Sequence, residues 1–153
     1  MRIEGSVILI TGGSSGLGLE TTKYLHSLGA NVSILDMREE EGNALVKQLG
    51  ERSIFFKVDV TSEDQVKNAI DGTVKKWGAI HAVLNSAGIA AAQTTINKSG
   101  TFASDLFKKV IEINVYGTLY VSKHAALQMS KQEERDGERG VIVNVSSVAA
   151  FDG

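Results

Sequence analysis

Short apolar runs alternate along this chain with longer segments of helical periodicity. The first run, residues 7–10 (VILI), is apolar at every position, as is typical of a strand buried on both faces of a parallel sheet. Residues 16–28 then place apolar side chains at helical spacing, and Gly29 follows as a stop signal. We therefore expect a strand, a glycine-containing turn and a helix.

The same alternation continues through the rest of the chain. Further strands are predicted at residues 31–36 (NVSILD), 53–58 (SIFFKV), 81–85 (HAVLN) and 141–145 (VIVNV). Helices are predicted from 39 to 50, from 62 to 77 and from about 103 to 130, and Ser62 with Gln65 is expected to form a capping box at the start of the second of these. The charged residues 131–139 (KQEERDGER) are interpreted as a solvated connection.

Strands that alternate with helices form βαβ units, whose crossovers are right-handed. The pattern therefore predicts an α/β fold of the Rossmann type, a doubly wound parallel sheet with strand order 3-2-1-4-5 when strands are numbered along the chain. A length of 153 residues with 42% hydrophobic composition predicts a single domain, residues 1–153.

Composition and charge exclude several classes of function. The formal charge is −2, with 16 basic and 18 acidic residues and no basic run, so no nucleic-acid partner is expected. There is no cysteine, and His26, His81 and His124 are scattered, so we expect no metal site. No apolar run approaches the roughly 20 residues that span a bilayer, so no membrane partner is expected and the protein is interpreted as soluble and intracellular.

The strongest chemical signal is a glycine-rich motif, residues 11–18 (TGGSSGLG), between the first predicted strand and helix. Glycine allows a sharp turn and lets backbone N–H groups approach a pyrophosphate, while the helix N-terminus faces the anion. The alternative is an ordinary glycine-rich surface turn. We expect dinucleotide binding by Gly12, Ser14, Ser15, Gly16, Leu17 and Gly18.

Asp36 ends the second predicted strand, 20 residues beyond Gly16. A carboxylate at that position accepts hydrogen bonds from the hydroxyls of the adenosine ribose and repels a 2′-phosphate, so it predicts NAD as the cofactor. Arg38, two positions on, leaves an NADPH-dependent reductase as a disfavoured alternative.

The spacing Gly-x-x-x-Gly-x-Gly, preceded by Thr11, resembles the short-chain dehydrogenase/reductase family. Residues 85–88 (NSAG) resemble the family's Asn-Asn-Ala-Gly, with Ser86 as a departure, and Ser146-Ser147 follows the last predicted strand. Taken alone, a serine pair after a strand is usually a turn or a helix cap. The resemblance implies cofactor contacts from Asp59, Val60, Asn85, Ala87 and Gly88, and makes Ser147 the catalytic serine.

Asn114 is a second candidate catalytic residue. It lies seven residues after Phe107 and seven before Val121, on the apolar face of the long predicted helix, where a polar side chain must be paired or it costs stability. An ordinary buried asparagine bonded to backbone is the alternative. The resemblance implies instead that Asn114 perturbs the helix locally and holds a water molecule of a proton relay.

Three segments resemble most the subgroup of the family that oxidises 3-hydroxyacyl-CoA thioesters and hydroxysteroids. They are residues 85–92 (NSAGIAAA), an insertion at 97–100 (NKSG) and residues 140–153 (GVIVNVSSVAAFDG). The resemblance implies an oxidoreductase that interconverts a secondary alcohol and a ketone with NAD. It also implies a homotetramer for the intact protein, in the cytoplasm or the mitochondrion.

Chemistry in this family needs a tyrosine four residues before a lysine, because a phenol acts as a base at neutral pH only beside a fixed positive charge. Tyr24, Tyr116 and Tyr120 are followed four residues later by Leu28, Tyr120 and His124. We therefore expect the C-terminal part of the fold to be absent, and this chain to bind NAD without turnover. The alternatives are a non-catalytic nucleotide-binding or assembly module and another substrate class of the same family.

Overall fold

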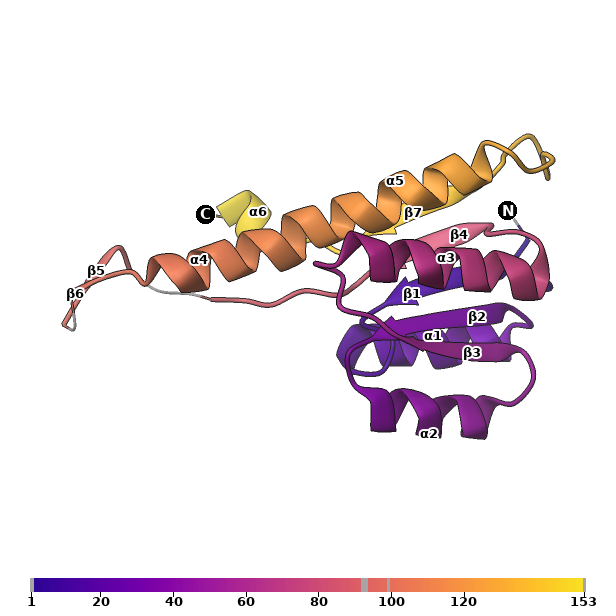
Figure 1. The fold of residues 1–153 in the computed structure, drawn as a ribbon, viewed down its shortest axis with the longest axis horizontal. Helices are drawn as coiled ribbons and strands as arrows, with labels where there is room; N and C mark the ends of the chain where they lie inside the picture. Colours follow the sequence, from indigo (N-terminus) through magenta and orange to yellow (C-terminus); the bar gives the residue numbers. More distant parts are fainter. Residues whose placement is uncertain (1, 92–93, 99, 153) are drawn as a thin grey trace.

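The computed structural model describes residues 2–91, 94–98 and 100–152, and its centre is a parallel sheet of five strands (Figure 1). The strand order is β3-β2-β1-β4-β7. Because β5 and β6 form a separate two-stranded sheet, β7 is the fifth strand of this sheet along the chain, and the predicted order 3-2-1-4-5 is confirmed. Thr11 at the end of β1 is paired in register with Leu35 of β2 and Asn85 of β4, so the strands end along one edge. The strands are β1 (Val7–Thr11), β2 (Asn31–Asp36), β3 (Ser53–Lys57), β4 (Ala82–Asn85) and β7 (Val141–Asn144).

Each face of the sheet is covered by a pair of helices. Ile8 and Ile10 of β1 face one apolar core, which is completed by α1 (Gly16–Ser27) and α2 (Glu39–Leu49). Leu9 faces the other core, which is completed by α3 (Glu63–Trp77) and α5 (Thr118–Met129). The alternation follows from the period of two along a strand, and it explains why the run 7–10 is apolar throughout.

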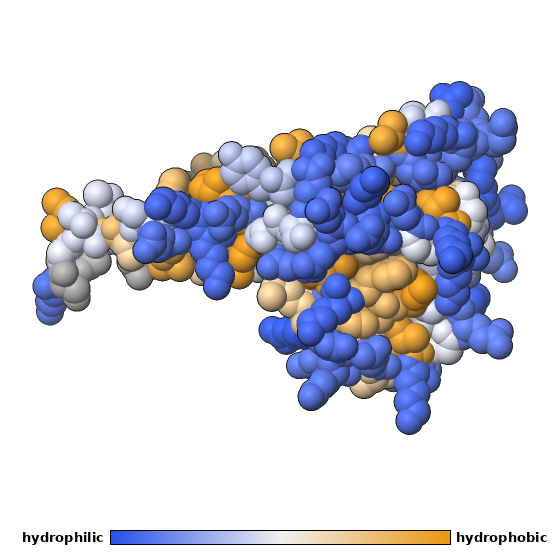
Figure 2. All heavy atoms as spheres, viewed as in Figure 1, coloured by the Kyte–Doolittle hydropathy of each residue, from blue (hydrophilic) through white to orange (hydrophobic). Residues whose placement is uncertain are grey.

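The helix predicted at about 103–130 is continuous but not uniform. It consists of α4 (Ser104–Ile111), a π-helical segment η1 (Glu112–Gly117) and α5. Its α4 end and the small antiparallel hairpin β5 (Ile96–Asn97) and β6 (Gly100–Thr101) project beyond the sheet (Figure 1). Hydrophobic atoms are visible on this projection (Figure 2), where Ile96 and Phe107 are exposed. A short helix, α6 (Ala149–Asp152), follows β7.

The predicted capping box at the start of α3 is wrong. Ser62 is the N-cap residue, but its side chain makes no capping hydrogen bond. Gln65 instead uses its side-chain oxygen to accept the backbone N–H of Asp59, at 2.9 Å. That N–H follows the end of β3 and has no strand partner there, so the glutamine satisfies a donor of the loop in place of one at the cap.

Glu63, in the first turn of α3, joins this helix to α5. Its carboxylate lies 2.6 Å from the Lys123 ammonium and 2.8 Å from His124 Nε2. The hydrogen bond from Lys123, followed by that from His124, lowers the pKa of Glu63. These contacts hold α5 against α3, and α5 continues directly from η1. In the part of the chain that the structure describes, no helix is both long enough and apolar enough to cross a membrane.

His81, the residue that precedes β4, is hydrogen-bonded to the first residue of β1. The backbone N–H of Val7 donates to His81 Nδ1 at 2.9 Å, which requires a free lone pair on that nitrogen. Burial lowers the pKa of His81, and the nearby Arg135 lowers it further. The folded state therefore favours the neutral imidazole.

We predict that the free energy of unfolding decreases as the pH falls below about 6.5. The pKa of His81 is lower in the folded state than the value of 6.5 for an unperturbed histidine, so the unfolded chain takes up the proton first. The stability that neutral His81 contributes is therefore fully present above pH 6.5, and it is lost as the pH falls toward the lower pKa of the folded state. Denaturant titrations over this range should show a smaller pH dependence in His81→Asn, whose side-chain oxygen can still accept from Val7.

Some acid sensitivity should remain in this variant, because burial and Arg52 also lower the pKa of His26. A pH dependence in His81→Asn equal to that of the unaltered chain would contradict the role given to His81.

Candidate functional site

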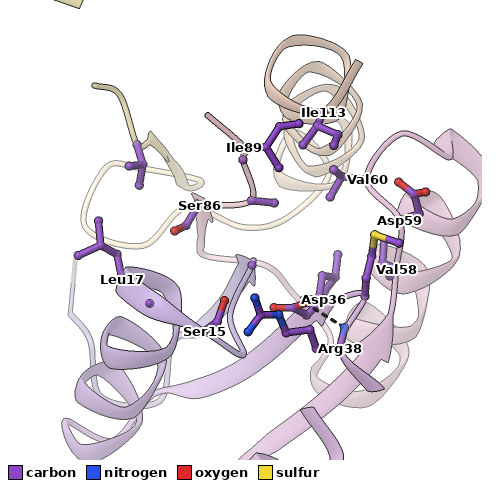
Figure 3. Close-up of a pocket in the computed structure, with 17 residues that line it drawn as sticks. Ser15, Leu17, Asp36, Arg38, Val58, Asp59, Val60, Ser86, Ile89 and Ile113 are labelled. Atoms are coloured by element: carbon purple, nitrogen blue, oxygen red, sulfur yellow. Dashed lines mark hydrogen bonds between the residues drawn. The ribbon is translucent and has the colours of Figure 1, made fainter. Parts of the chain in front are cut away.

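The strands end at a cavity of about 400 Å³ that lies at the carboxyl edge of the sheet (Figure 3). Ligands of open α/β sheets bind at this edge, next to the point between β1 and β4 where the strand order reverses. Most of the residues predicted to bind the cofactor line this one cavity. They are Gly12, Ser15, Gly16, Leu17, Asp36, Asp59, Val60, Ala87 and Gly88.

The turn between β1 and α1 is built from close backbone contacts. Gly12 and Gly16 have φ angles of +65° and +51°, a region that favours glycine. A Cβ atom on Gly18 would overlap the carbonyl oxygen of Gly12, so the first turn of α1 packs directly on the preceding loop. Ser15, the N-cap residue, makes no capping hydrogen bond through its side chain, and the first turn holds no acidic residue. The helix therefore offers unsatisfied N–H groups to an anion.

Asp36 is held in place by two backbone donors. The N–H of Ser14 donates to its Oδ2 at 3.0 Å, and the N–H of Arg38 donates to its Oδ1 at 3.1 Å. A carboxylate has about four lone-pair directions, so two are left for hydroxyl donors from a ligand. The same side chain thus fixes the glycine-rich turn to the end of β2 and presents acceptors to the cavity.

Thr11 fixes the loop after β4 against the same turn. Its hydroxyl oxygen accepts the backbone N–H groups of Ser86 and Ala87, both at 3.1 Å. A Cβ atom on Gly12 would come within 3.0 Å of Ala87 Cα, so these two loops meet with no space for a side chain at Gly12. Where these two loops meet, the cavity is therefore lined by backbone.

Three predicted cofactor residues do not line this cavity. Ser14 is buried, and its hydroxyl oxygen has no hydrogen-bond partner within the described residues. Gly18 lies beneath the turn, as described above. Asn85 lines a neighbouring cavity and donates from Nδ2 to Ser122 Oγ at 3.1 Å and to Asn144 Oδ1 at 2.9 Å.

The neighbouring cavity, of about 370 Å³, brings both candidate catalytic residues together. Asn114 and Ser147 line it, and Gly88 and Val145 belong to its walls and to those of the first cavity. Ser147 Oγ also accepts the backbone N–H of Ala149 at 3.2 Å, so the serine shapes the turn before α6 as well. A ligand that extends from the first cavity into the second would reach both side chains.

Asn114 is paired as expected, but it is exposed and not buried. Its Oδ1 accepts the N–H of Ile89 and its Nδ2 donates to the carbonyl of the same residue, both at 2.9 Å. The expected burial is wrong because Asn114 lies on an exposed side of η1, whereas Gly117 and Ile113 of the same segment are the residues that pack inward. The predicted perturbation of the helix is present as η1, and π-helical segments are frequent at functional sites.

Other residues line the first cavity that the sequence analysis did not assign to the site. Several follow strands directly, so the rule that ligands bind at carboxyl ends could have identified them. Arg38 is the charged residue of this group, and from the sequence it was considered only for the choice between NAD and NADPH. The group comprises Leu35, Met37, Arg38, Val58, Ser86, Ile89, Ile113 and Val145.

Parts of two predictions fall beyond what the structure describes. Ala92, Ser99 and Gly153 belong to the segments that resemble the 3-hydroxyacyl-CoA subgroup, and they lie outside the described residues. Over residues 2–91, 94–98 and 100–152, no three histidine, cysteine, aspartate or glutamate side chains come together as a metal site.

Comparison with known proteins agrees with this geometry. A family model described as short chain dehydrogenase matches residues 6–153. The chain is 43% identical over 154 residues to a 3-hydroxyacyl-CoA dehydrogenase type-2 of Drosophila melanogaster, and 41% identical over the same length to that of Homo sapiens. Each match covers 99% of this chain, but 60% and 59% of the relative.

A solved structure is also similar. The crystal structure of 3-hydroxyacyl-CoA dehydrogenase type-2 from Mycobacterium avium matches with a TM-score of 0.90 at 32% identity, covering 99% of this chain and 61% of that one. The chain therefore spans about three fifths of the length of these relatives.

We predict that Gly18→Ala lowers the free energy of unfolding by about 2 kcal/mol or more, because the new methyl group would overlap the Gly12 carbonyl and force the turn apart. Gly16→Ala is the matched control. A Cβ atom there meets open space, so only the left-handed φ should cost about 1 kcal/mol. Chemical denaturation measures both, and equal losses would show that close packing at Gly18 is unimportant.

Proposed function

This chain belongs to the short-chain dehydrogenase family, and on that premise we propose that it binds NAD as the cofactor portion of an alcohol–ketone oxidoreductase. One observation carries the proposal. The N-terminus of α1 and the Asp36 carboxylate line the same cavity, and the N–H of Ser14 links the two. An anion is favoured at the first feature and a diol at the second, and a dinucleotide carries both groups at neighbouring positions.

The residues present fit this cofactor. A Cβ atom on Gly16 would meet open space, so the start of α1 allows close approach, and the amides of Ser15, Gly16 and Leu17 would hold the pyrophosphate. Asp36 would accept from the adenosine ribose, and Asp59 with Val60 would contact the adenine from the loop after β3. Asn85, Ala87 and Gly88 would support the nicotinamide end from the loop after β4.

In the reaction, NAD supplies the hydride acceptor. The Ser147 hydroxyl would donate a hydrogen bond to the substrate oxygen in the second cavity and hold the alcohol carbon toward the cofactor. Asn114, held against Ile89, would position a water molecule of the proton relay from η1. The base, a tyrosine paired with a lysine four residues later, is not among these 153 residues, so we expect binding without turnover from them alone.

The names of the relatives support a proposal for the substrate class. Several matched proteins carry the name 3-hydroxyacyl-CoA dehydrogenase type-2, so the proposed substrate of the whole protein is a 3-hydroxyacyl-CoA thioester, with a hydroxysteroid as the second choice. A homotetramer is proposed for the whole protein, in the cytoplasm or the mitochondrion. Exposed apolar residues along the long helix support association, and they include Phe107, Val115, Leu119 and Leu127.

A non-catalytic role is the second candidate. The observation that favours it is the lack of a Tyr-x-x-x-Lys pair in a chain that still has the dinucleotide cavity. Sedimentation with and without NAD separates the two functions. A stable assembly of fixed stoichiometry favours a binding or assembly module, whereas aggregation favours a portion that needs the rest of the enzyme.

We predict that Asp36→Asn weakens NAD binding about tenfold or more, because hydrogen bonds to a charged acceptor are the stronger ones. Asp71→Asn, an isosteric change on the exposed surface of α3, should leave the dissociation constant unaltered. Calorimetric titration with NAD measures both variants. Equal affinities of the two variants would remove Asp36 from the site, and a lack of NAD binding by the unaltered chain would refute the proposed function.

We also expect no steady-state production of NADH when the chain is mixed with NAD and a 3-hydroxyacyl-CoA thioester. The reason is that no residue of the chain supplies the base paired with a lysine. Absorbance of NADH follows the reaction directly. A sustained rate that disappears in Ser147→Ala would show that these residues hold a complete active site.

A further inference from the structure

A third cavity, of about 330 Å³, lies between the loop before α3 and the long helix, which runs beside α3 (Figure 1). Glu112 and Tyr116 of η1 and Tyr120 of α5 form one wall, and Thr61 forms the other. None of these four residues lines the two cavities described above. The volume falls within the range of roughly 300–1,000 Å³ that is typical of small-molecule sites.

Two tyrosines supply aromatic surface to this third cavity. Tyr116 and Tyr120 are four residues apart and therefore share one side of the helix. Their ring centroids are 6.1 Å apart and the ring planes make an angle of 36°, so the rings are tilted toward each other and not stacked. Aromatic rings attract cations to their faces. Tyr120 already has such a neighbour, because the Lys123 ammonium lies 5.0 Å from its ring centroid.

Glu112 supplies a negative charge that the chain leaves without a partner. Its side chain is exposed, and it forms no ion pair or hydrogen bond with any described residue. Two nearby cations are bound to other carboxylates. Lys123 lies 2.6 Å from Glu63, and Lys108, one turn before Glu112, lies 3.6 Å from Asp105. A positively charged ligand in the third cavity would therefore meet an unpaired carboxylate beside two aromatic rings.

The opposite wall is held in place before any ligand binds. The backbone N–H and the hydroxyl of Thr61 both donate to Asp59 Oδ1, at 2.9 Å and 2.7 Å. Thr61 therefore loses little conformational freedom when a ligand contacts it, which reduces the cost of binding.

These groups favour an organic cation over a metal ion. Mg²⁺ and Ca²⁺ take six or more oxygen ligands, whereas the third cavity offers one carboxylate, and the described residues contain no cluster of three metal-ligating side chains. A quaternary ammonium group needs no hydrogen-bond acceptor, is attracted to ring faces and is balanced by a single carboxylate. We infer that the third cavity binds the quaternary ammonium group of a small organic cation.

An apolar contact is the alternative use of this surface. Val115 and Leu119, each one position before a tyrosine of the pair, are exposed on the adjoining side of the helix. A purely apolar contact does not distinguish a cation from a neutral molecule of the same shape. The ring faces and the Glu112 carboxylate do distinguish them.

The test is an NMR titration of the chain with choline, with 3,3-dimethylbutan-1-ol as an uncharged analogue of the same shape and sodium chloride as a control for ionic strength. Choline should cause saturable shifts of the Tyr116 and Tyr120 ring signals and of the Thr61 amide, and the neutral analogue should bind about fivefold more weakly or less. Tyr116→Leu and Glu112→Gln should each weaken choline binding about two- to fivefold. Tyr24→Leu removes an exposed tyrosine of α1 outside the cavity and should leave choline binding unchanged.

Equal affinities for choline and the neutral analogue would overturn the inference in favour of an apolar contact. Shifts reproduced by sodium chloride would overturn it in favour of charge screening, and equal effects of Tyr116→Leu and Tyr24→Leu would show that choline binds elsewhere. Tighter binding of a trimethyllysine peptide than of choline would overturn the assignment to a small molecule. None of these results depends on NAD binding, so the proposed function is tested separately.

Discussion

Close backbone packing at Gly12 is the constraint on which the rest of this structure depends. One side of Gly12 faces the first turn of α1 at Gly18, and the other faces Ala87 in the loop after β4. A side chain at either glycine would separate these segments. Since three chain segments meet there without side chains between them, this part of the cavity wall consists of backbone groups, and the start of α1 stays open toward the carboxyl edge of the sheet.

The charges of the site are arranged around that packing. Asp36 fixes the turn through the N–H of Ser14, and it is the same carboxylate that would face the ribose. Thr11 fixes the opposite loop, which carries the chain from the first cavity to the second. Structure and binding therefore use the same atoms, so a substitution at Asp36 is expected to alter both the loop and the ligand affinity.

The sequence predicts those features that depend on local pattern. The apolar runs identify the five strands and their parallel order, and the spacing of glycines with Asp36 identifies the cofactor corner. The features it misses depend on partners far along the chain. Gln65 accepts the Asp59 N–H and does not cap the helix, and Asn114 is exposed, with its amide bonded to the backbone of Ile89. Neither partner can be read from local spacing.

The most direct measurement of the central claim is an NMR titration of the ¹⁵N-labelled chain, whose mass of 16.3 kDa suits amide spectra, with NAD. The account predicts saturable shifts of the backbone amides of Gly12, Ser15 and Gly16, together with those that flank Asp36. Shifts confined to other surfaces, with the amides of the glycine-rich turn unaffected at saturation, would contradict it.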